Sequence, residues 1–527
     1  MRRLFSKGYL RLVPVLPRIF LSVAVTVTAA IAHAQTASAP LPQDVENALA
    51  ERDYATAREG LALLAEPQDA IEAQYQYAQL LWNGLGGEVD TTAALALLEN
   101  AAARNHPGAA LFLARVYLTG PQASVSRDPA RAAELLRIAT DQNVAEAQFY
   151  LGMLTKDGTG LPADPAAALT LLKAAATGGY VEAQYVLAQA YSRGDGVPLD
   201  SAKALQWLTA AAEGGNTEAQ YFLANALKRG DGAQQDIVAA FRWYRRAAEQ
   251  NLPIAQRTLG TAYMTGNEPL QKNPQEAYRW LKAAADAGDP GAMFNLAIGL
   301  SGALETLKDD AQAAAYLLAA SDTGLARATF MLAQFTEHGR GVPQDLRAAA
   351  LLYRTAFEQG DARGAVRLGQ LTGQGALKDM VPPHFSVPWT VAAAQEGDAG
   401  ALAWLADQAE KGLRDAQVSY GLFLLDAGED AQVAARFLEQ AAQAGAPAAQ
   451  HRLGVLYTTG TGVTLDYVLA HKWLNIAATN GIEAAVETRE VIGNLMTPEQ
   501  LAEAQGAARH FFENATAPDS IANTVNQ

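Results

Sequence analysis

Residues 183–218 read AQYVLAQAYSRGDGVPLDSAKALQWLTAAAEGGNTE and contain two helical patterns separated by a short break. In both halves apolar residues recur at spacings typical of one helix face, at Ala183, Leu187 and Tyr191 and then at Ala204, Leu205, Leu208, Ala211 and Ala212. Gly194 can take the left-handed conformation that ends the first helix. Asp200 can accept hydrogen bonds from the free N–H groups that open the second helix. The stretch therefore predicts a helical hairpin.

The hairpin recurs along the chain with a period of about 36 residues. An alanine, here termed the anchor, opens each unit, at Ala73, Ala109, Ala147, Ala183, Ala219, Ala255, Ala292, Ala328, Ala365, Ala416 and Ala449. A glycine eleven residues later is expected to end the first helix, at positions 84, 120, 158, 194, 230, 266, 339 and 460. A capping side chain is expected to open the second helix, at Asp90, Asp128, Asp164, Asp200, Asp236, Asn273, Asp309, Asp345 and Asp466. Three columns that stay in phase predict a repeat protein.

The repeated pattern resembles the Sel-one-like repeat (SLR) family, whose members are relatives of the tetratricopeptide repeats. The shared pattern is A-x-x-x-L-G/A-x-x-Y-x-x-G-x-G-V-x-x-D-x-x-x-A-x-x-W-L-x-x-A-A-x-x-G, and the segments that match best are 183–215, 219–250, 255–288, 328–360 and 449–481. The resemblance covers roughly residues 73–513. It implies an all-α fold, a right-handed α-solenoid (superhelix) of antiparallel helix-turn-helix repeats. It also implies a scaffold or adaptor for other proteins.

Residues 1–34 have the features of a signal peptide. An apolar run over 19–31 and the small residues before Gln35 predict cleavage there, after a basic region formed by Arg2, Arg3, Lys7, Arg11 and Arg18. The apolar run is shorter than the roughly 20 residues that a membrane span needs. Ordinary secretion is favoured over twin-arginine export, which the Arg2-Arg3 pair loosely suggests. We expect a periplasmic protein, with a secreted or signal-anchored protein as the alternatives.

The remaining chain is expected to fall into seven segments. They are a linker (35–42), an N-terminal capping helix pair (43–71), a solenoid arm (73–364), a degenerate repeat that forms a bend (365–415), C-terminal repeats (416–484), C-terminal capping helices (485–514) and a disordered tail (515–527). The sequence from Thr497 to Gln500 predicts a capping box at the start of the last helix.

The regular spacing breaks at 365–415, where 51 residues rather than 36 separate successive anchors. The prolines of 380–388 predict an irregular insertion, because proline lacks the N–H that a helix interior needs. Residues 389–397 are expected to form the second helix of this repeat, and 399–412 an extra helix without a partner. An unpaired helix would change the phase of the stack, so we interpret the segment as a bend.

Composition excludes several classes of function. The chain has no cysteine, which excludes a thiol-linked lipid anchor, disulfides and thiolate metal sites. Its net charge is −15, and removal of residues 1–34 would change it to −20. Nucleic acid and anionic lipid are therefore disfavoured as partners, whereas a basic protein or an extended peptide segment fits the charge.

No catalytic, cofactor or metal site is expected. The sequence lacks H-E-x-x-H, G-x-S-x-G, S-x-x-K and Walker motifs, and its histidines show no ligand spacing. The recurrent glycine pairs are expected to be turns between helices rather than phosphate-binding loops. One column of the second helices holds Trp207, Trp243, Trp280 and Trp473. Core packing explains this column most simply, and sugar stacking is the alternative.

A second aromatic column follows two residues after the anchors and faces the inner curve in the tetratricopeptide alignment. A packing consensus is the simpler explanation of the column, and a peptide-binding groove is the other, since rigid aromatics carry much of the energy of such interfaces. On the second explanation the partner-binding residues are Tyr75, Phe149, Tyr185, Gln189, Arg193, Tyr221, Asn225, Arg229, Phe294 and Phe330.

The sequence thus favours a non-enzymatic, exported SLR scaffold or adaptor that mediates protein–protein interactions in the cell envelope. Regulation of an envelope complex or sensor would be its role. The alternative is an envelope protein that binds peptidoglycan or another polysaccharide through its tryptophan and tyrosine faces. An envelope hydrolase is disfavoured because no nucleophile–base constellation is present.

Overall fold

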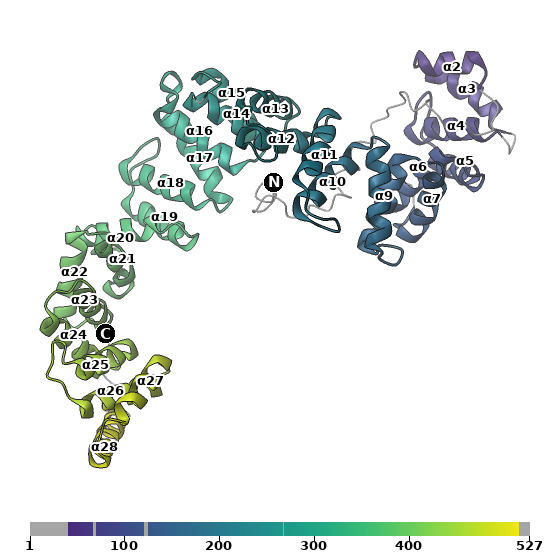
Figure 1. The fold of residues 1–527 in the computed structure, drawn as a ribbon. Coiled ribbons are helices and arrows are strands. Elements are labelled where there is room, and N and C mark those ends of the chain that lie inside the picture. Colours follow the sequence, from purple (N-terminus) through teal and green to yellow (C-terminus); the bar gives the residue numbers. More distant parts are fainter. Residues whose placement is uncertain (1–40, 67–69, 121–124, 267, 516–527) are drawn as a thin grey trace. The chain divides into compact units, whose positions relative to one another are not determined.

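The computed structural model describes residues 41–66, 70–120, 125–266 and 268–515, and these residues contain no β-strand. They form 27 α-helices, α2 to α28, most of which pair as consecutive hairpins (Figure 1). The prediction of an all-α solenoid of helix-turn-helix repeats is therefore confirmed. The expected signal peptide, most of the expected linker and all but the first residue of the expected tail lie outside the described residues.

The chain divides into two compact units, Met1–Asp289 and Pro290–Gln527. The first unit opens with a helix pair, α2 (Gln43–Ala50) and α3 (Tyr54–Leu64), followed by six repeats. The first helices of these repeats are α4 (Ile71–Asn83), α6 (Pro107–Thr119), α8 (Ala145–Asp157), α10 (Val181–Arg193), α12 (Thr217–Arg229) and α14 (Pro253–Thr265). The second helices are α5 (Thr91–Ala103), α7 (Pro129–Asp141), α9 (Pro165–Thr177), α11 (Ser201–Glu213), α13 (Ile237–Glu249) and α15 (Pro274–Asp286).

The second unit contains five hairpins and three further helices. The first helices of the hairpins are α16 (Pro290–Ile298), α18 (Ala326–His338), α20 (Arg363–Gly373), α23 (Arg414–Asp426) and α25 (Pro447–Thr459). The second helices are α17 (Asp310–Asp322), α19 (Leu346–Glu358), α21 (Pro383–Gln395), α24 (Ala431–Gln443) and α26 (Tyr467–Thr479). The further helices are α22 (Ala399–Glu410), α27 (Glu483–Gly493) and α28 (Pro498–Ala515).

The predicted glycines and capping residues set the helix ends. Seven of the eight glycines adopt the left-handed conformation directly after a first helix, and Gly120 has a positive φ with an extended ψ. Each predicted capping residue accepts a hydrogen bond from the first turn of its helix, as Asp200 does from the N–H groups of Ala202 and Lys203. The hairpin that opens with α16 has Ala303 where others have glycine. There the first helix ends in a π-helical turn over Gly299–Ala303.

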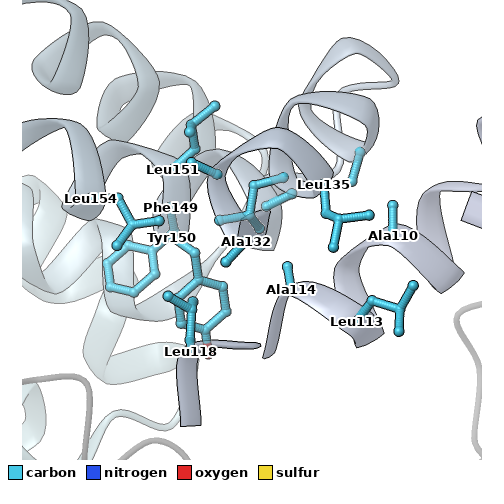
Figure 2. Close-up of a cluster of buried hydrophobic side chains, with 14 of the residues drawn as sticks. Ala110, Leu113, Ala114, Leu118, Ala132, Leu135, Phe149, Tyr150, Leu151 and Leu154 are labelled. Carbon is cyan, nitrogen blue, oxygen red and sulfur yellow. The ribbon is translucent and has the colours of Figure 1, made fainter. Parts of the chain in front are cut away.

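The anchor alanines lie in the core, each at most 5% exposed. First and second helices of a repeat pack together, and within each unit each second helix also packs on the next first helix. Figure 2 shows this arrangement for α6, α7 and α8, whose leucines, alanines and aromatic rings meet in one cluster. Small residues permit the close approach. A Cβ atom on Gly260, for example, would lie 2.9 Å from the backbone nitrogen of Leu281 in the partner helix.

A column of glutamines directly after the anchors, not singled out from the sequence, ties neighbouring repeats together. The amide nitrogen of Gln220 donates to the carbonyl of Ala212, at the end of the preceding second helix, over 3.2 Å. Equivalent bonds are made by Gln74, Gln184, Gln256, Gln417 and Gln450. Most of these carbonyl groups, at the ends of helices, also accept from the backbone N–H three residues later, so the glutamine adds a second bond.

The prediction of an irregular segment over 380–388 is wrong from Pro383 onward, because α21 already begins there. Pro383 occupies the first helical position, where a missing N–H costs nothing, and only Pro388 lies inside the helix. Tertiary packing offsets the cost of Pro388. Val387 is buried, and α20 approaches so closely that a Cβ atom on Gly369 would lie 2.1 Å from the carbonyl oxygen of Trp389.

The extra helix expected after this repeat is present as α22, and it packs against α20, α21 and α23. At the C-terminal end α28 packs on α26, with the rings of Phe511 and Trp473 5.6 Å apart. The N–H of Thr497 donates to the Gln500 side chain and the N–H of Gln500 to the Thr497 hydroxyl, which is the predicted capping box. Among the described helices none is both long and apolar enough to cross a membrane.

Candidate partner-binding face

The aromatic column of the first helices divides into two groups. Phe149 and Phe330 are buried, 1% and 9% exposed, whereas Tyr75, Tyr185, Tyr221 and Phe294 are half-buried. Because Phe294 and Phe330 belong to the second compact unit, the first unit alone carries the other eight residues of the predicted set. The half-buried rings contribute to packing and also keep part of their surface accessible.

Several of these rings pack on residues of the next first helix or on the residue that caps it. The ring of Tyr75 lies 4.6 Å from that of His106, and the ring of Phe149 lies 5.0 Å from that of Tyr180. Tyr185 stacks on Phe222 at 6.3 Å with an interplanar angle of 24°. The aromatic column therefore contributes to packing between helices, which was the simpler of the two explanations of its recurrence.

Tyr185 has a buried hydroxyl group although its ring is only half-buried. Its hydroxyl oxygen is buried and has no hydrogen-bond partner among the described residues. Burial raises the pKa of this hydroxyl, and the Gln189 side chain opposes the shift. The phenol thus stays neutral at physiological pH, and the rest of the ring supplies an uncharged surface beside α12.

The polar residues of the predicted set have different environments. Asn225 is held in place, because its amide nitrogen donates to the Tyr221 carbonyl over 2.9 Å and its oxygen accepts from the Tyr244 hydroxyl over 3.0 Å. Gln189 is half-buried, and Arg229 is exposed. Arg193 lies 4.0 Å from the carboxylate of Asp195. The structure thus leaves Gln189 and Arg229 at the surface of α10 and α12.

Carboxylates directly before the anchors form a further column that was not singled out from the sequence. They belong to Glu72, Glu146, Glu182 and Glu218, and the signal is a recurrent E-A-Q tripeptide. All four are half-buried at the start of a first helix. Negative charge at this end of a helix is favourable, which gives the column a structural role of its own.

The column differs from repeat to repeat in its partners. Glu72 accepts a hydrogen bond from His106, which lowers the pKa of the carboxyl group. Glu146 forms an ion pair with Arg115, which opposes the larger effect of burial in raising the pKa of that carboxyl group. No cation of the described residues forms an ion pair with Glu182 or Glu218.

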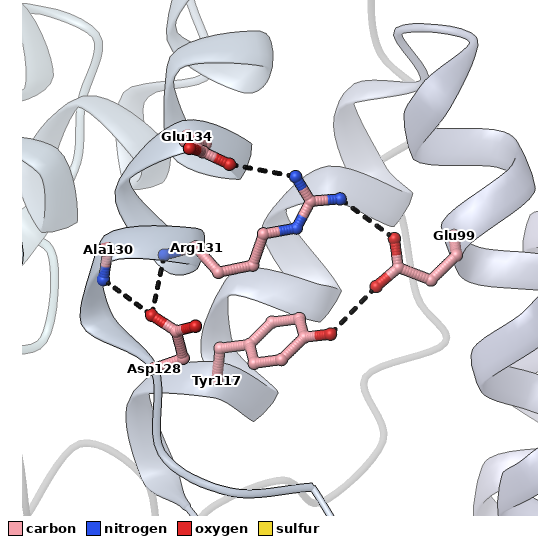
Figure 3. A network of polar contacts seen from close by, with 6 residues as sticks. All are labelled: Glu99, Tyr117, Asp128, Ala130, Arg131 and Glu134. Atoms are coloured by element: carbon pink, nitrogen blue, oxygen red, sulfur yellow. Dashed lines mark hydrogen bonds and ion pairs between the residues drawn. The ribbon is translucent and has the colours of Figure 1, made fainter.

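A second charged cluster, between α5, α6 and α7, is internally satisfied (Figure 3). The guanidinium of Arg131 lies 3.1 Å from the Glu99 carboxylate and 3.0 Å from that of Glu134. The Tyr117 hydroxyl donates to the other oxygen of Glu99 over 3.0 Å. Every charge here has a partner within the chain, so the cluster joins three helices and offers no free group to a ligand.

The tryptophan column is closer to core than to surface. Trp280 and Trp473 are 5% and 3% exposed, and Trp207 and Trp243 are half-buried. A sugar-binding platform needs exposed ring faces, so this burial favours a packing role. Within the described ranges no group of three or more histidine, cysteine, aspartate or glutamate side chains could hold a metal ion.

Helical hairpins that stack through anchors, caps and glutamine bridges define an α-solenoid repeat protein. The chain belongs to the Sel1 repeat family, whose model matches residues 71–106, 107–144, 145–180, 181–216, 217–252, 253–289, 290–325, 326–361, 415–445 and 447–482. Sel1 repeat proteins generally mediate protein–protein interactions, and their scaffold is generally non-catalytic. The unmatched residues 362–414 include the segment whose spacing is irregular.

Two solved structures illustrate the similarity. The crystal structure of c5321, a protective antigen of uropathogenic Escherichia coli strains with an SLR fold, is 27% identical and has a TM-score of 0.58. That match covers 88% of this chain and 96% of the other. A Sel1 repeat protein from Oxalobacter formigenes is 29% identical over 46% of this chain and 94% of its own, with a TM-score of 0.41. A search of curated proteins found no significant match.

Proposed function

We propose that the protein is an exported adaptor that binds a protein partner in the cell envelope through the first helices of its first unit. The observation that carries this proposal is the set of half-buried rings at one position of neighbouring first helices, Tyr185 and Tyr221 above all. Rigid, partly exposed aromatics are frequent anchors of protein interfaces. By holding a partner segment, the adaptor would organise or restrain an envelope complex or sensor.

Three further observations support this proposal. The burial of Trp280 and Trp473 disfavours a polysaccharide-binding role for these two members of the tryptophan column. The basic, apolar and small-residue series before Gln35 supports export to the periplasm. The similar E. coli protein is a protective antigen, which fits a protein of the envelope.

Photo-crosslinking in the producing cells tests the interface. A photoreactive residue at Gln189 should give discrete adducts with a protein partner. The matched control carries it at Gln206, an exposed position on the second helix of the same repeat. Adducts that form equally at both positions, or only at Gln206, would contradict the proposal.

N-terminal sequencing of the exported protein tests the location. The expected first residue is Gln35, and the expected fraction is the periplasm. Recovery of the chain with Met1 intact in the membrane fraction would show that the signal is retained as an anchor.

A further inference from the structure

The Arg115–Glu146 ion pair gives the register between neighbouring first helices. Arg115 lies six residues after its anchor, Ala109, and Glu146 lies one residue before the next anchor, Ala147. The sixth position after one anchor thus lies opposite the position before the next. Glu182 also contributes to the raised pKa of Glu146, so the carboxylates of successive repeats are near enough to influence one another.

The same register places uncharged residues opposite the next two carboxylates. Met153 corresponds to Arg115 in front of Glu182, and Gln189 corresponds to it in front of Glu218. The charge of Glu218 contributes to the raised pKa of Tyr185 and the charge of Arg193 opposes it, so both groups are near enough to act on this hydroxyl. Two half-buried carboxylates therefore occupy a position that an arginine neutralises in the preceding repeat.

In the second unit, arginine side chains lie over rings of the aromatic column. There the residues near the following anchor are arginines, and the guanidinium of Arg327 lies 4.6 Å from the ring centre of Phe294. Arg363 lies 4.4 Å from the ring centre of Phe330 in the same way. In the first unit no cation of the described residues lies over Tyr185 or Tyr221, and glutamates stand near the anchors instead.

We propose that Glu182 and Glu218, together with the rings of Tyr185 and Tyr221, bind a lysine or arginine side chain from an extended segment of the partner protein. The inference rests on the proposed function and specifies the chemistry of the partner. A half-buried carboxylate beside an aromatic face attracts a guanidinium or ammonium through charge and through the ring. The partner's cation takes the place that Arg115 fills at Glu146.

Helix stabilisation is the competing explanation of these glutamates, since an acidic residue in the first turn interacts favourably with the helix dipole. On that explanation Glu182→Gln and Glu218→Gln would lower stability and leave binding unchanged. Binding and stability must therefore be measured on the same variants.

The probes are short fluorescent glycine–serine peptides that carry several arginines, several glutamates or no charge. Fluorescence anisotropy with the full exported chain should show binding of the arginine peptide only. The E182Q/E218Q variant should bind it about tenfold more weakly, because a hydrogen-bonded charge pair is lost. The control E213Q/E249Q removes the same charge from exposed ends of second helices in the same repeats, and its affinity should stay within about twofold.

A third variant fills the site from within the chain. Gln189→Arg places a guanidinium in front of Glu218, in the register of Arg115 and Glu146. We expect Gln189→Arg to weaken arginine-peptide binding about as strongly as the single variant E218Q, measured in the same assay. Its melting temperature should equal or exceed that of the wild type.

The inference is overturned if arginine and glutamate peptides bind alike, if neither binds, or if E213Q/E249Q loses as much affinity as E182Q/E218Q. Unchanged affinity in Gln189→Arg would overturn it as well. The proposed adaptor function fails separately, when crosslinking at Gln189 gives no specific partner. If a partner crosslinks equally to the wild type and to E182Q/E218Q, the adaptor function stands and the proposed cation site is refuted.

Discussion

The imidazole of His106 bridges two repeats by bonding through both of its nitrogens. Nδ1 accepts from the N–H of Ala109 over 3.0 Å, so the proton lies on Nε2, which donates to the Glu72 carboxylate over 3.0 Å. The same side chain thus caps α6 and holds the start of α4. Since the bond favours the ionised carboxyl group, the pKa of Glu72 is lowered below its ordinary value near 4.5.

Replacement of Glu72 by Gln should change how stability depends on pH. A lowered pKa in the folded state gives stability that is present above about pH 4.5 and is lost as pH falls through the folded value. At pH 7 the variant should be less stable by about 1 kcal/mol, and the difference should shrink as the pH falls below 4.5. Thermal melts across this range provide the measurement, with Glu213→Gln as the exposed control. Parallel pH curves for wild type and Glu72→Gln would contradict the assigned bond.

Replacement of Gln220 by Ala should destabilise the junction between its repeat and the preceding one. Gln220 is 3% exposed, donates to the Ala212 carbonyl and accepts from the Gln250 amide over 3.1 Å. Loss of the side chain removes both hydrogen bonds from a buried position, and each is worth about 0.5–1.5 kcal/mol. The Ala212 carbonyl keeps its bond from the Gly215 N–H, and the exposed Gln250 amide can turn to water. In the control Gln142→Ala the lost bond to Asn105 is exposed, so water can replace it. Equal unfolding midpoints for the two variants would argue against the bridging role.

The sequence was sufficient for the repeat architecture because its signals are local. Gly194 and Asp200 act on the backbone of their own turn, so their effect can be inferred without knowledge of the neighbours. The start of α21 could not be inferred from local signals. A proline at position 388 destabilises the helix, and only the packing of α21 on α20 offsets this cost. The family resemblance rests on the same local signals, and it therefore predicted the order of the hairpins correctly.

The candidate site was only partly predictable. The shared position of Phe149 and Tyr185 is visible in the sequence, but their different burial depends on the residues that the next repeat brings against them. The E-A-Q tripeptides that mark Glu182 and Glu218 were visible too. Their lack of a cation becomes apparent only when Arg115 and Glu146 show which positions of neighbouring helices meet.

Alanine substitution should separate the core members of the aromatic column from those at its surface. Phe149→Ala removes a buried ring that contacts Tyr150 and Tyr180, and it should lower the free energy of unfolding by about 3–5 kcal/mol. Tyr221→Ala removes a half-buried ring and should cost less than half as much. Urea unfolding monitored by circular dichroism measures both. If Tyr221→Ala lowers the free energy of unfolding as much as Phe149→Ala does, the Tyr221 ring belongs to the core and not to the partner-binding face.

Replacement of Gly369 by Ala should disrupt the hairpin of α20 and α21 more than its single methyl group suggests. The new Cβ would lie 2.1 Å from the carbonyl oxygen of Trp389 and 2.6 Å from the Cβ of Ala393, so the two helices must move apart. Overpacking of a tight helix contact costs about 1–3 kcal/mol, and separation also removes the packing that offsets Pro388.

The control is Gly375→Ala. Gly375 has a positive φ of 75° but no atom near its Cβ position, so only backbone strain is added there. Limited proteolysis should cut Gly369→Ala within 374–398 faster than Gly375→Ala. Equal cleavage rates would mean that α21 does not depend on its close contact with α20.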